Sequence, residues 1–225
     1  MAELLTGAAR EQRRAAVAEL GTALRELVEA CVLTEVPEGE LAAVAASARE
    51  LTARLGVGAR GLRDVAGCDD PAAGERWYSP VYGPGSPVAP PLELGSAGRD
   101  GVHATATLGK THEGPPGLVH GGTTAMLLDH VLARAVRVAG AGGLTATLTV
   151  TYRRPVRLGV PLVLDARVTG TEGRRTTAHA TVAAADAPDT VLAEADGLFV
   201  ALRPEAAAAT FAGVSHVVDA WTSRG

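Results

Sequence analysis

The stretch His112–Asp129, HEGPPGLVHGGTTAMLLD, decides the fold, because a loop of restricted shape leads directly into a buried helix. Pro115 and Pro116 lie between two glycines and predict a tight loop with few side chains in the way. The run TTAMLLDHVLARAV at 123–136 is long enough for about four helical turns and is almost entirely apolar. A helix that is apolar on nearly all sides is typical of one buried in a core.

The sequence on both sides of this helix has apolar residues at every second position, which is typical of strands. Before the helix, the apolar positions of this alternation are Val102, Ala104, Ala106 and Leu108. After the helix, the predicted strands are 144–153, 161–170, 174–185 and 190–202. One or two strands, a buried helix and four consecutive strands predict an α+β fold, with an antiparallel sheet wrapped round one central helix.

Two amphipathic helices precede this main domain. The first spans about 3–32 and the second follows Pro37, each with one narrow apolar stripe. Such a stripe is too narrow to form a core alone, so we expect this helical pair to dock on another surface. Residues 57–91 are rich in Gly and Pro and read as an irregular linker. The predicted units are 1–60 (N-terminal helical extension), 75–205 (main domain) and 206–225 (C-terminal tail).

Length and composition fit one sizeable core with an appendage: the chain has 225 residues, of which 47% are hydrophobic and 20% charged. The net charge of −4 argues against nucleic acid as a partner. No window approaches the roughly 18 unbroken apolar residues of a membrane span, and residues 1–15 are too charged for a signal peptide. We therefore expect a cytoplasmic protein that binds neither nucleic acid nor membrane.

Residue usage excludes further classes. Cys31 and Cys68 are the only cysteines, too few for a disulfide scaffold or a zinc site, and the 6 histidines lack the spacing of metal ligands. We therefore expect no metal and no cofactor. The chain contains no Ile and no Asn, and Lys110 is its only lysine, which indicates a GC-rich bacterial genome. A mechanism that requires an asparagine is excluded.

His120-Gly121-Gly122 stands at the expected start of the buried helix. Backbone N–H groups at a helix start have no partner within the helix and lie at the positive end of its dipole. Glycine lets a substrate oxygen approach them closely, so this pattern indicates an oxyanion hole. The structural alternative is that the two glycines only permit close packing of the helix on the sheet.

Asp129 lies deep in the apolar run, where an ionised carboxylate is costly unless it is paired or solvated. The functional interpretation is a catalytic carboxylate that acts as a general base on water or as a nucleophile. The alternative is an exposed strip of the helix on which Asp129 and His130 simply face water.

Other catalytic motifs fail to match. The segment HEGPP differs from the metal-binding motif H-E-x-x-H, and no G-x-S-x-G elbow is present, which excludes the α/β-hydrolases. Arg153, Arg154 and Arg157 flank the end of a predicted strand. They either meet an anionic phosphate or form a solvated edge of the sheet.

Three motifs together carry a family resemblance. The order EGPPG-x-VHGG-x-x-A-x-x-x-D at 113–129, the strand end TYRRP at 151–155 and the segment AEADGLFVAL at 193–202 resemble the hotdog-fold acyl-CoA thioesterases of the PaaI-like branch. The resemblance covers roughly 80–203 and leaves 1–60 outside. It implies a hotdog fold and hydrolysis of an acyl-CoA thioester.

The resemblance also implies the catalytic residues. In that family the glycine after the HGG histidine supplies the oxyanion N–H, which is Gly121 here. The aspartate nine residues after that histidine is the catalytic carboxylate, here Asp129. A Ser or Thr seven residues before the strand's aromatic often helps to hold water, here Thr145. His120 itself completes the expected catalytic set.

The chain departs from the family pattern at one position. Some relatives use an Asn ahead of the HGG, whereas this chain has Gly114 at the corresponding place. Glu113 or His112 are candidates to replace it, although a loop-capping role for Glu113 is the favoured interpretation. The residues expected to bind substrate are Gly122, Glu113, Arg153, Arg154 and Arg157.

Three hypotheses for the activity follow. The leading one is hydrolysis of an acyl-CoA or related thioester to a carboxylic acid and a free thiol. The alternative is a non-catalytic hotdog protein that binds acyl-CoA or acts as a scaffold. A hotdog hydratase is disfavoured, because it needs an Asp and a His separated along a longer segment. Asp129 and His130 are adjacent and point about 100° apart on a helix.

Helix geometry predicts a homodimer. Gly121 and Asp129 are eight residues apart, which is roughly 12 Å along a helix axis. The substrate carbonyl must lie about 3 Å from the oxyanion donor, and the attacking water must reach its base. We therefore expect two antiparallel helices across a two-fold axis, with Thr145 and Asp129 from one subunit facing Gly121 of the other. A dimer of such dimers is also compatible with this geometry.

Overall fold

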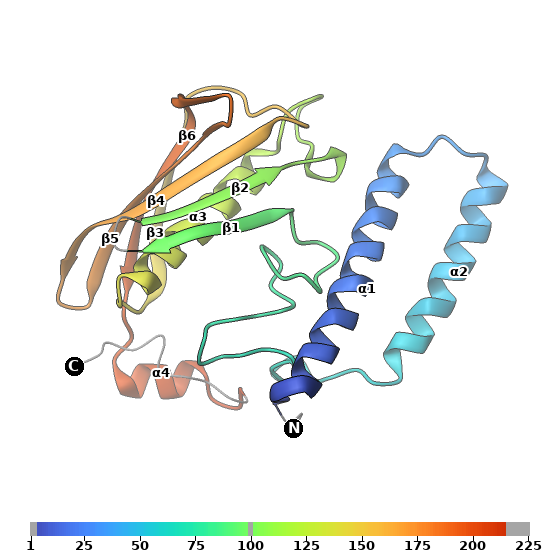
Figure 1. Ribbon diagram of the computed structural model, residues 1–225, viewed down its shortest axis with the longest axis horizontal. Coiled ribbons are helices and arrows are strands. Elements are labelled where there is room, and N and C mark those ends of the chain that lie inside the picture. The colour runs from blue at the N-terminus through green and yellow to red at the C-terminus, as the bar shows by residue number, and fades with distance from the viewer. Residues whose placement is uncertain (1–3, 99–100, 215–225) are drawn as a thin grey trace.

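The computed structural model describes residues 4–98 and 101–214 and has a six-stranded antiparallel sheet that curves round one helix (Figure 1). In chain order the elements are α1 (Gly7–Leu33), α2 (Glu38–Gly56), β1 (Leu92–Gly98), β2 (Gly101–Thr107), η1 (Lys110–His112), α3 (Gly121–Val138), β3 (Leu144–Tyr152), β4 (Pro161–Glu172), β5 (Arg175–Ala184), β6 (Ala187–Val200) and α4 (Pro204–Thr210). The strand order is β1-β2-β4-β5-β6-β3. The predicted α+β hotdog fold, with α3 as its central helix, is confirmed.

The core pairs large side chains on α3 with small ones on the sheet. Leu127, Leu128, Val131 and Leu132 of α3 are each at most 2% exposed. The small residues on the facing strands are Ala104, Ala106, Ala166, Ala178, Ala180, Ala193 and Ala195. The helix therefore sits close to the sheet: a Cβ at Gly197 would lie 3.2 Å from the side chain of Leu132. Each fully buried Leu or Val contributes about 1.5–3 kcal/mol.

Strand β3 lies at one edge of the sheet and pairs only with β6. Its outer edge therefore has unpaired backbone groups, which favour pairing with another strand. Leu144 and Tyr152, at its two ends, are 37% and 53% exposed. An edge strand with exposed apolar side chains is a candidate interface.

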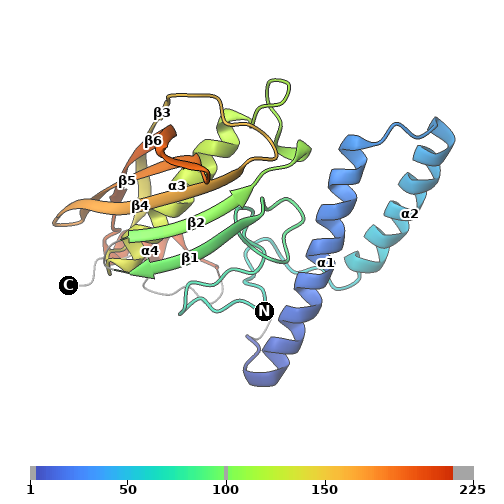
Figure 2. The same ribbon diagram turned by 45° about the horizontal axis from the view of Figure 1, so that its top comes forward.

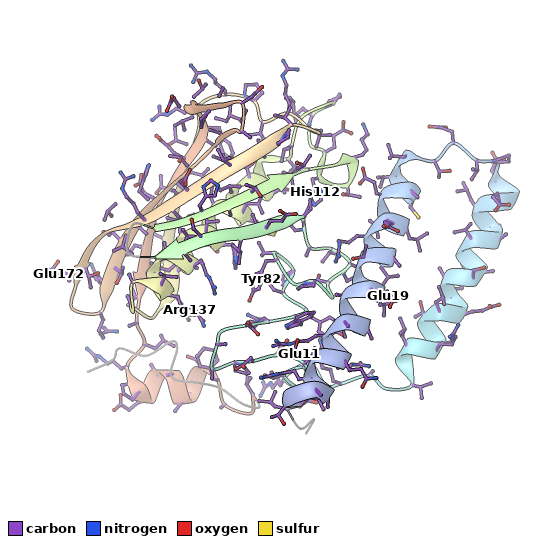
Figure 3. The ribbon with its side chains drawn as sticks, in the orientation of Figure 1. Glu11, Glu19, Tyr82, His112, Arg137 and Glu172 are labelled. Carbon is purple, nitrogen blue, oxygen red and sulfur yellow. The ribbon has the colours of Figure 1, made fainter. Side chains whose placement is uncertain are left out.

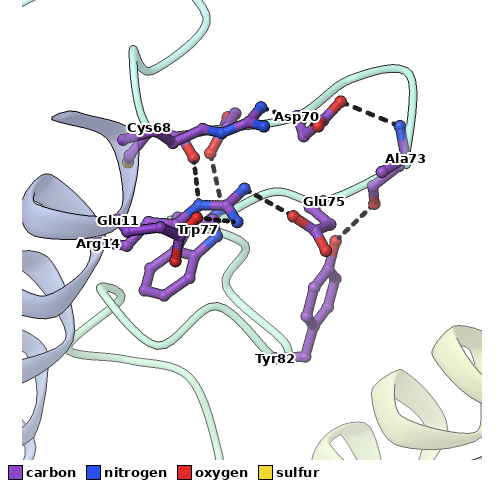
Figure 4. Close-up of polar contacts among 11 residues, drawn as sticks. Glu11, Arg14, Cys68, Asp70, Ala73, Glu75, Trp77 and Tyr82 are labelled. Atoms are coloured by element: carbon purple, nitrogen blue, oxygen red, sulfur yellow. Dashed lines mark hydrogen bonds and ion pairs between the residues drawn. The ribbon is translucent and has the colours of Figure 1, made fainter. Parts of the chain in front are cut away.

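Helix α1 docks on the irregular segment 57–91 through a polar network (Figure 4). The Arg14 guanidinium donates to the carbonyl of Cys68 at 3.0 Å and to the carboxylate of Glu75 at 2.6 Å. The same guanidinium lies 5.0 Å from the ring centroid of Trp77. One arginine thus connects three points of a segment that has little regular structure of its own.

Helix α1 also holds the start of the loop that leads to α3. The Glu29 carboxylate accepts hydrogen bonds from the backbone N–H groups of Lys110 and Thr111, at 2.8 and 3.2 Å. These two residues belong to η1, directly before the stretch that decides the fold. The N-terminal extension therefore contacts the loop that leads to the candidate site.

Helix α2 departs from the expectation that both N-terminal helices dock on another surface. It has no buried residue, and its apolar positions Leu41, Val44, Leu51 and Leu55 are all exposed. Figure 2 shows α2 beyond α1, on the side away from the sheet. The prediction that the helical pair docks is confirmed for α1 and wrong for α2 within the described residues. Helix α1 lies between α2 and the sheet, so the apolar row of α2 meets no surface within the described residues.

Packing of α1 should tolerate no side chain at Gly21. A Cβ there would lie 2.1 Å from the Pro84 carbonyl oxygen, so Gly21→Ala should lower the free energy of unfolding by about 1–3 kcal/mol. Gly39, in helix α2, has nothing within 4 Å of its Cβ position. Gly39→Ala should therefore be neutral or stabilise by up to about 1 kcal/mol. Urea unfolding of both variants checks this, and an equal effect at the two glycines would contradict the packing.

Candidate functional site

The loop before α3 is braced by Glu113. Its carboxylate accepts a hydrogen bond from the Gly117 N–H at 2.7 Å and forms an ion pair with Lys110 at 2.6 Å. The bonds from Lys110 and Gly117 lower the pKa of Glu113, so the carboxylate stays ionised. Gly117 has φ 77°, a conformation that side chains disfavour. The loop-capping interpretation of Glu113 is confirmed by these contacts.

His120 is the N-cap residue of α3. Its Nδ1 accepts a hydrogen bond from the Gly122 N–H at 3.0 Å, and its carbonyl accepts from the N–H groups of Thr123 and Thr124. Gly121, as the first residue of α3, has no helical acceptor for its own N–H. Among the described residues no hydrogen bond uses that N–H. One donor at the helix start is therefore available to a ligand.

Tyr152 holds the peptide group between Gly121 and Gly122, which directly follows the free N–H. Its hydroxyl donates to the Gly121 carbonyl oxygen at 2.8 Å. A Cβ at Gly121 would lie 3.3 Å from the same hydroxyl, which is a tight contact. In the sequence Tyr152 served only as the aromatic landmark of its strand, and its pattern did not predict this contact. An exposed aromatic at a strand end was the only signal.

Thr145 and Asp129 come together, as the sequence predicted for two residues of one subunit. The Thr145 hydroxyl donates to Asp129 Oδ1 at 2.9 Å, and Asp129 is half-buried on α3. Thr145 lies at the start of β3 and Tyr152 at its end. A single edge strand therefore contacts both the candidate base and the candidate oxyanion donor. Those two groups remain about 12 Å apart along one helix.

The arginine cluster lies beside the loop but is largely engaged with its own chain. Arg153 forms an ion pair with Glu194, and Arg154 Nη1 donates to the Val191 carbonyl at 3.3 Å. Arg157 pairs through its backbone with Leu118. Arg157 thus borders the 112–122 loop, and in the described part of the chain no hydrogen bond or ion pair joins the three arginines to Asp129.

His130, next to Asp129, turns away from water. Its ring stacks on Tyr82 with centroids 4.5 Å apart, and Tyr82 belongs to the irregular segment (Figure 3). Burial, together with the smaller effect of the charges on Arg134 and Arg137, lowers the pKa of His130 to about 4. An exposed strip carrying both Asp129 and His130 is therefore wrong. The sequence carried no signal for this contact, because Tyr82 is 48 positions away and on no regular element.

Two features are absent from residues 4–98 and 101–214: a cluster of metal ligands and a helix that could span a membrane. No group of three or more His, Cys, Asp or Glu side chains in these ranges is placed to hold a metal ion. No helix in them is long and apolar enough to cross a membrane.

Comparison with known proteins gives consistent matches. The thioesterase superfamily model matches residues 116–191. A crystal structure of a thioesterase superfamily protein is 32% identical, with 88% of this chain and 97% of that chain covered and a TM-score of 0.73. Acyl-coenzyme A thioesterase THEM4 of Xenopus laevis is 40% identical over 94 residues, which is 41% of each chain. Its counterpart in Bos taurus is 36% identical over 93 residues, covering 41% of this chain and 38% of the relative. The chain thus matches about two fifths of the length of these two relatives.

Stability should decrease as the pH falls from 6.5 towards 4, partly because of His130. The folded pKa of about 4 lies below the ordinary histidine value of 6.5, so in this window the unfolded chain binds a proton that the folded chain does not. The contribution is fully present above pH 6.5 and is lost as the pH falls to about 4. Urea unfolding across this range should give a shallower slope for His130→Gln than for the wild type. An NMR titration that placed the His130 pKa near 6.5 would contradict the burial argument.

Proposed function

This chain belongs to the thioesterase superfamily, and from that premise we propose that it hydrolyses an acyl-CoA thioester to a carboxylic acid and a free thiol. The observation that carries the proposal is the hydrogen bond of 2.9 Å from Thr145 to Asp129, on the same helix whose first N–H, that of Gly121, is free to bind a ligand. A carboxylate held in place and an unpaired donor at a helix start are the two groups that hydrolysis of a thioester needs.

In the proposed reaction Asp129 takes a proton from water while the water oxygen attacks the thioester carbonyl carbon. The carbonyl π electrons move onto oxygen, and the Gly121 N–H of the partner subunit stabilises that negative charge. The tetrahedral intermediate collapses, the C–S bond breaks, and the CoA thiolate leaves with the proton that Asp129 took from water, which restores the Asp129 carboxylate. Attack by the Asp129 carboxylate itself, through an acyl-enzyme anhydride, is the other form of this proposal.

Three side chains would position these groups. The Thr145 hydroxyl donates its hydrogen bond to Asp129, so Thr145 can hold the attacking water only by accepting a hydrogen bond from it. His120 orients the first turn of α3 through its bond to Gly122, and Tyr152 fixes the Gly121 carbonyl. These contacts support a positioning role for His120, in place of direct contact with the reacting atoms.

The substrate-binding set remains a proposal. The Gly122 N–H is engaged by His120, so Gly122 would contribute only an open approach to the helix start. Glu113 would act through the shape of the loop that it caps. Arg157 pairs with Leu118 of that loop, and it would meet the CoA phosphates together with Arg153 and Arg154, since guanidinium groups bind phosphate well.

We propose a homodimer in which two β3 strands join edge to edge. The unpaired edge of β3 and its exposed Leu144 and Tyr152 support this arrangement. A two-fold axis at β3 would run the two α3 helices antiparallel, and it would bring Asp129 and Thr145 of one subunit towards Gly121 of the other. A dimer of dimers is a further form of this proposal.

We also propose a division of the chain into units, a branch of the superfamily, a bacterial source and a cytoplasmic location. The units 1–60, 75–205 and 206–225 are our division of the chain, and the superfamily match at 116–191 lies inside the second of them. Membership of the PaaI-like branch and a bacterial source rest on the sequence motifs and composition. The free thiols of Cys31 and Cys68 support a reducing compartment such as the cytoplasm.

Release of thiol from a panel of acyl-CoAs, followed with a thiol-reactive dye, tests the proposal directly. Saturable turnover of at least one substrate is the expected result. Binding of acyl-CoA without thiol release would favour the alternative, a non-catalytic acyl-CoA-binding or scaffolding hotdog protein.

Asp129→Asn should lower kcat by about 10²–10⁴-fold and leave KM nearly unchanged, because it removes the base and keeps the shape of the side chain. Asp165→Asn is the matched control, since Asp165 is an exposed aspartate on β4 whose side chain hydrogen-bonds to His103. Steady-state kinetics on one good substrate compares the two variants. Near-normal kcat in Asp129→Asn would exclude Asp129 as the base.

Two inactive chains should complement each other if the site is shared. Gly121→Pro removes the donor while keeping the helix, because proline is favoured at the first helical position and His120 already has φ −60° and ψ 133°. Mixing it with Asp129→Asn should restore up to about a quarter of wild-type activity after random subunit exchange, as one intact site in half of the dimers predicts. Gly121→Ala keeps the N–H and is the control. Demonstrated exchange without recovered activity would mean that each site is built from one chain.

A further inference from the structure

A cavity of about 280 Å³ lies between the irregular segment, strand β1 and the outward face of α3. Its wall combines Arg76, Trp77 and Tyr82 of the segment with Leu94 of β1 and Arg134 of α3. Asp129 and Thr145 are not among the residues that line it. The volume suits a small ligand or one end of a larger one.

The segment that forms one wall is fixed tightly against α3. Tyr82 stacks on His130 and donates through its hydroxyl to the Gly74 carbonyl at 3.3 Å. A Cβ at Gly74 would lie 1.8 Å from Arg137 Nη1, so only glycine lets this arginine lie against the segment. Figure 3 and Figure 4 show Tyr82 on the side of the segment that faces α3. The wall is therefore built by specific contacts.

Two buried nitrogen atoms of α3 have no hydrogen-bond partner among the described residues: Arg134 Nε, in a side chain that lines the cavity, and His130 Nε2, in a ring that stacks on the lining residue Tyr82. These residues are four apart on α3, so their side chains lie on the same face, one turn from each other. An unpaired buried polar atom is unfavourable, and in native proteins it commonly marks the place of an ion or ligand. Arg134 Nε carries a hydrogen, and neutral His130 can carry one on Nε2, so both can donate.

The charges around the cavity are predominantly positive. Arg76 and Arg134 line it, and Arg137 lies one turn beyond Arg134. The only carboxylate in the lining is Glu75, which is already paired with Arg14 at 2.6 Å. Tyr82 stays neutral because burial raises the pKa of its hydroxyl. Among the residues that line the cavity, Arg76 and Arg134 therefore have no carboxylate other than the paired Glu75.

We propose that this cavity binds a carboxylate or phosphate group, with the guanidinium groups of Arg134 and Arg76 as its cationic partners. Guanidinium groups match the geometry and charge of both anions. The anion has two possible sources, a free small anion and the charged end of a larger substrate. The site is separate from the Asp129 site, so the proposal holds whether or not the chain hydrolyses thioesters.

Binding of inorganic phosphate and of glutarate, titrated at constant ionic strength against chloride, tests the proposal. The wild type should bind at least one of them saturably, as a rise in Tm and as heat in calorimetry. Arg134→Gln should weaken this binding about tenfold or more, the effect of one lost charge-assisted hydrogen bond. Arg49→Gln, on the exposed surface of α2, is the matched control and should bind as the wild type does. Equal binding by wild type and Arg134→Gln, or none by the wild type, would overturn the proposal.

An NMR titration of the wild type keeps the test independent of how the variant folds. The ring signals of His130 and Tyr82 should shift along a saturable curve with phosphate or glutarate. Signals that stay unchanged while any binding is detected would place the anion elsewhere and overturn the proposal.

The source of the anion follows from the kinetics of Arg134→Gln on two thioesters of equal chain length, glutaryl-CoA and pentanoyl-CoA; this part alone rests on the proposed function. A KM raised only for glutaryl-CoA assigns the site to an acyl carboxylate. A KM raised for both assigns it to the CoA phosphates, and a KM raised for neither assigns it to a free anion. Each of these results supports the site once direct binding is lost in the variant. Absence of all hydrolysis by the wild type would refute the proposed function and leave the binding result intact.

Discussion

The packing of large aliphatic side chains of α3 against an alanine-lined sheet positions everything else in this protein. Leu128, Val131 and Leu132 have no exposed surface, and Ala104, Ala180 and Ala193 on the facing strands have none either. A sheet with larger side chains on this face would push the helix outward and open the contact. Because the helix is held at this depth, its first turn reaches the loop at 112–122 and its second half faces the irregular segment.

Strand β3 then links the helix to the edge of the sheet. Its first hydroxyl side chain, Thr145, holds Asp129, and its last residue, Tyr152, holds the carbonyl of Gly121. The same strand has an unpaired edge. Assembly at that edge would therefore act on both candidate catalytic groups at once, because any shift of β3 moves both of its contacts with α3.

The opposite side of α3 is covered by a segment without regular structure, which depends on α1 for its shape. Arg14 binds it at Cys68 and Glu75, and Gly21 lets the helix backbone approach Pro84. The segment in turn places Tyr82 on His130 and forms a wall of the cationic cavity. The N-terminal extension thus contributes to the body of the protein through α1, while α2 keeps its apolar row exposed.

The sequence by itself determined the regular elements and the local chemistry at the start of α3. Alternation of apolar residues located the strands, the apolar run located α3, and HGG marked the free donor, because these features depend on neighbours within a few positions. Only the tertiary structure decided what lies against each face. The family resemblance placed Thr145 and Asp129 in one site, whereas the hydrogen bond between them, the Tyr152–Gly121 bond, the Tyr82–His130 stack and the docking of α1 without α2 were not anticipated. These contacts join residues far apart in the chain, and hydrophobic periodicity carries no information on which distant polar group will meet which.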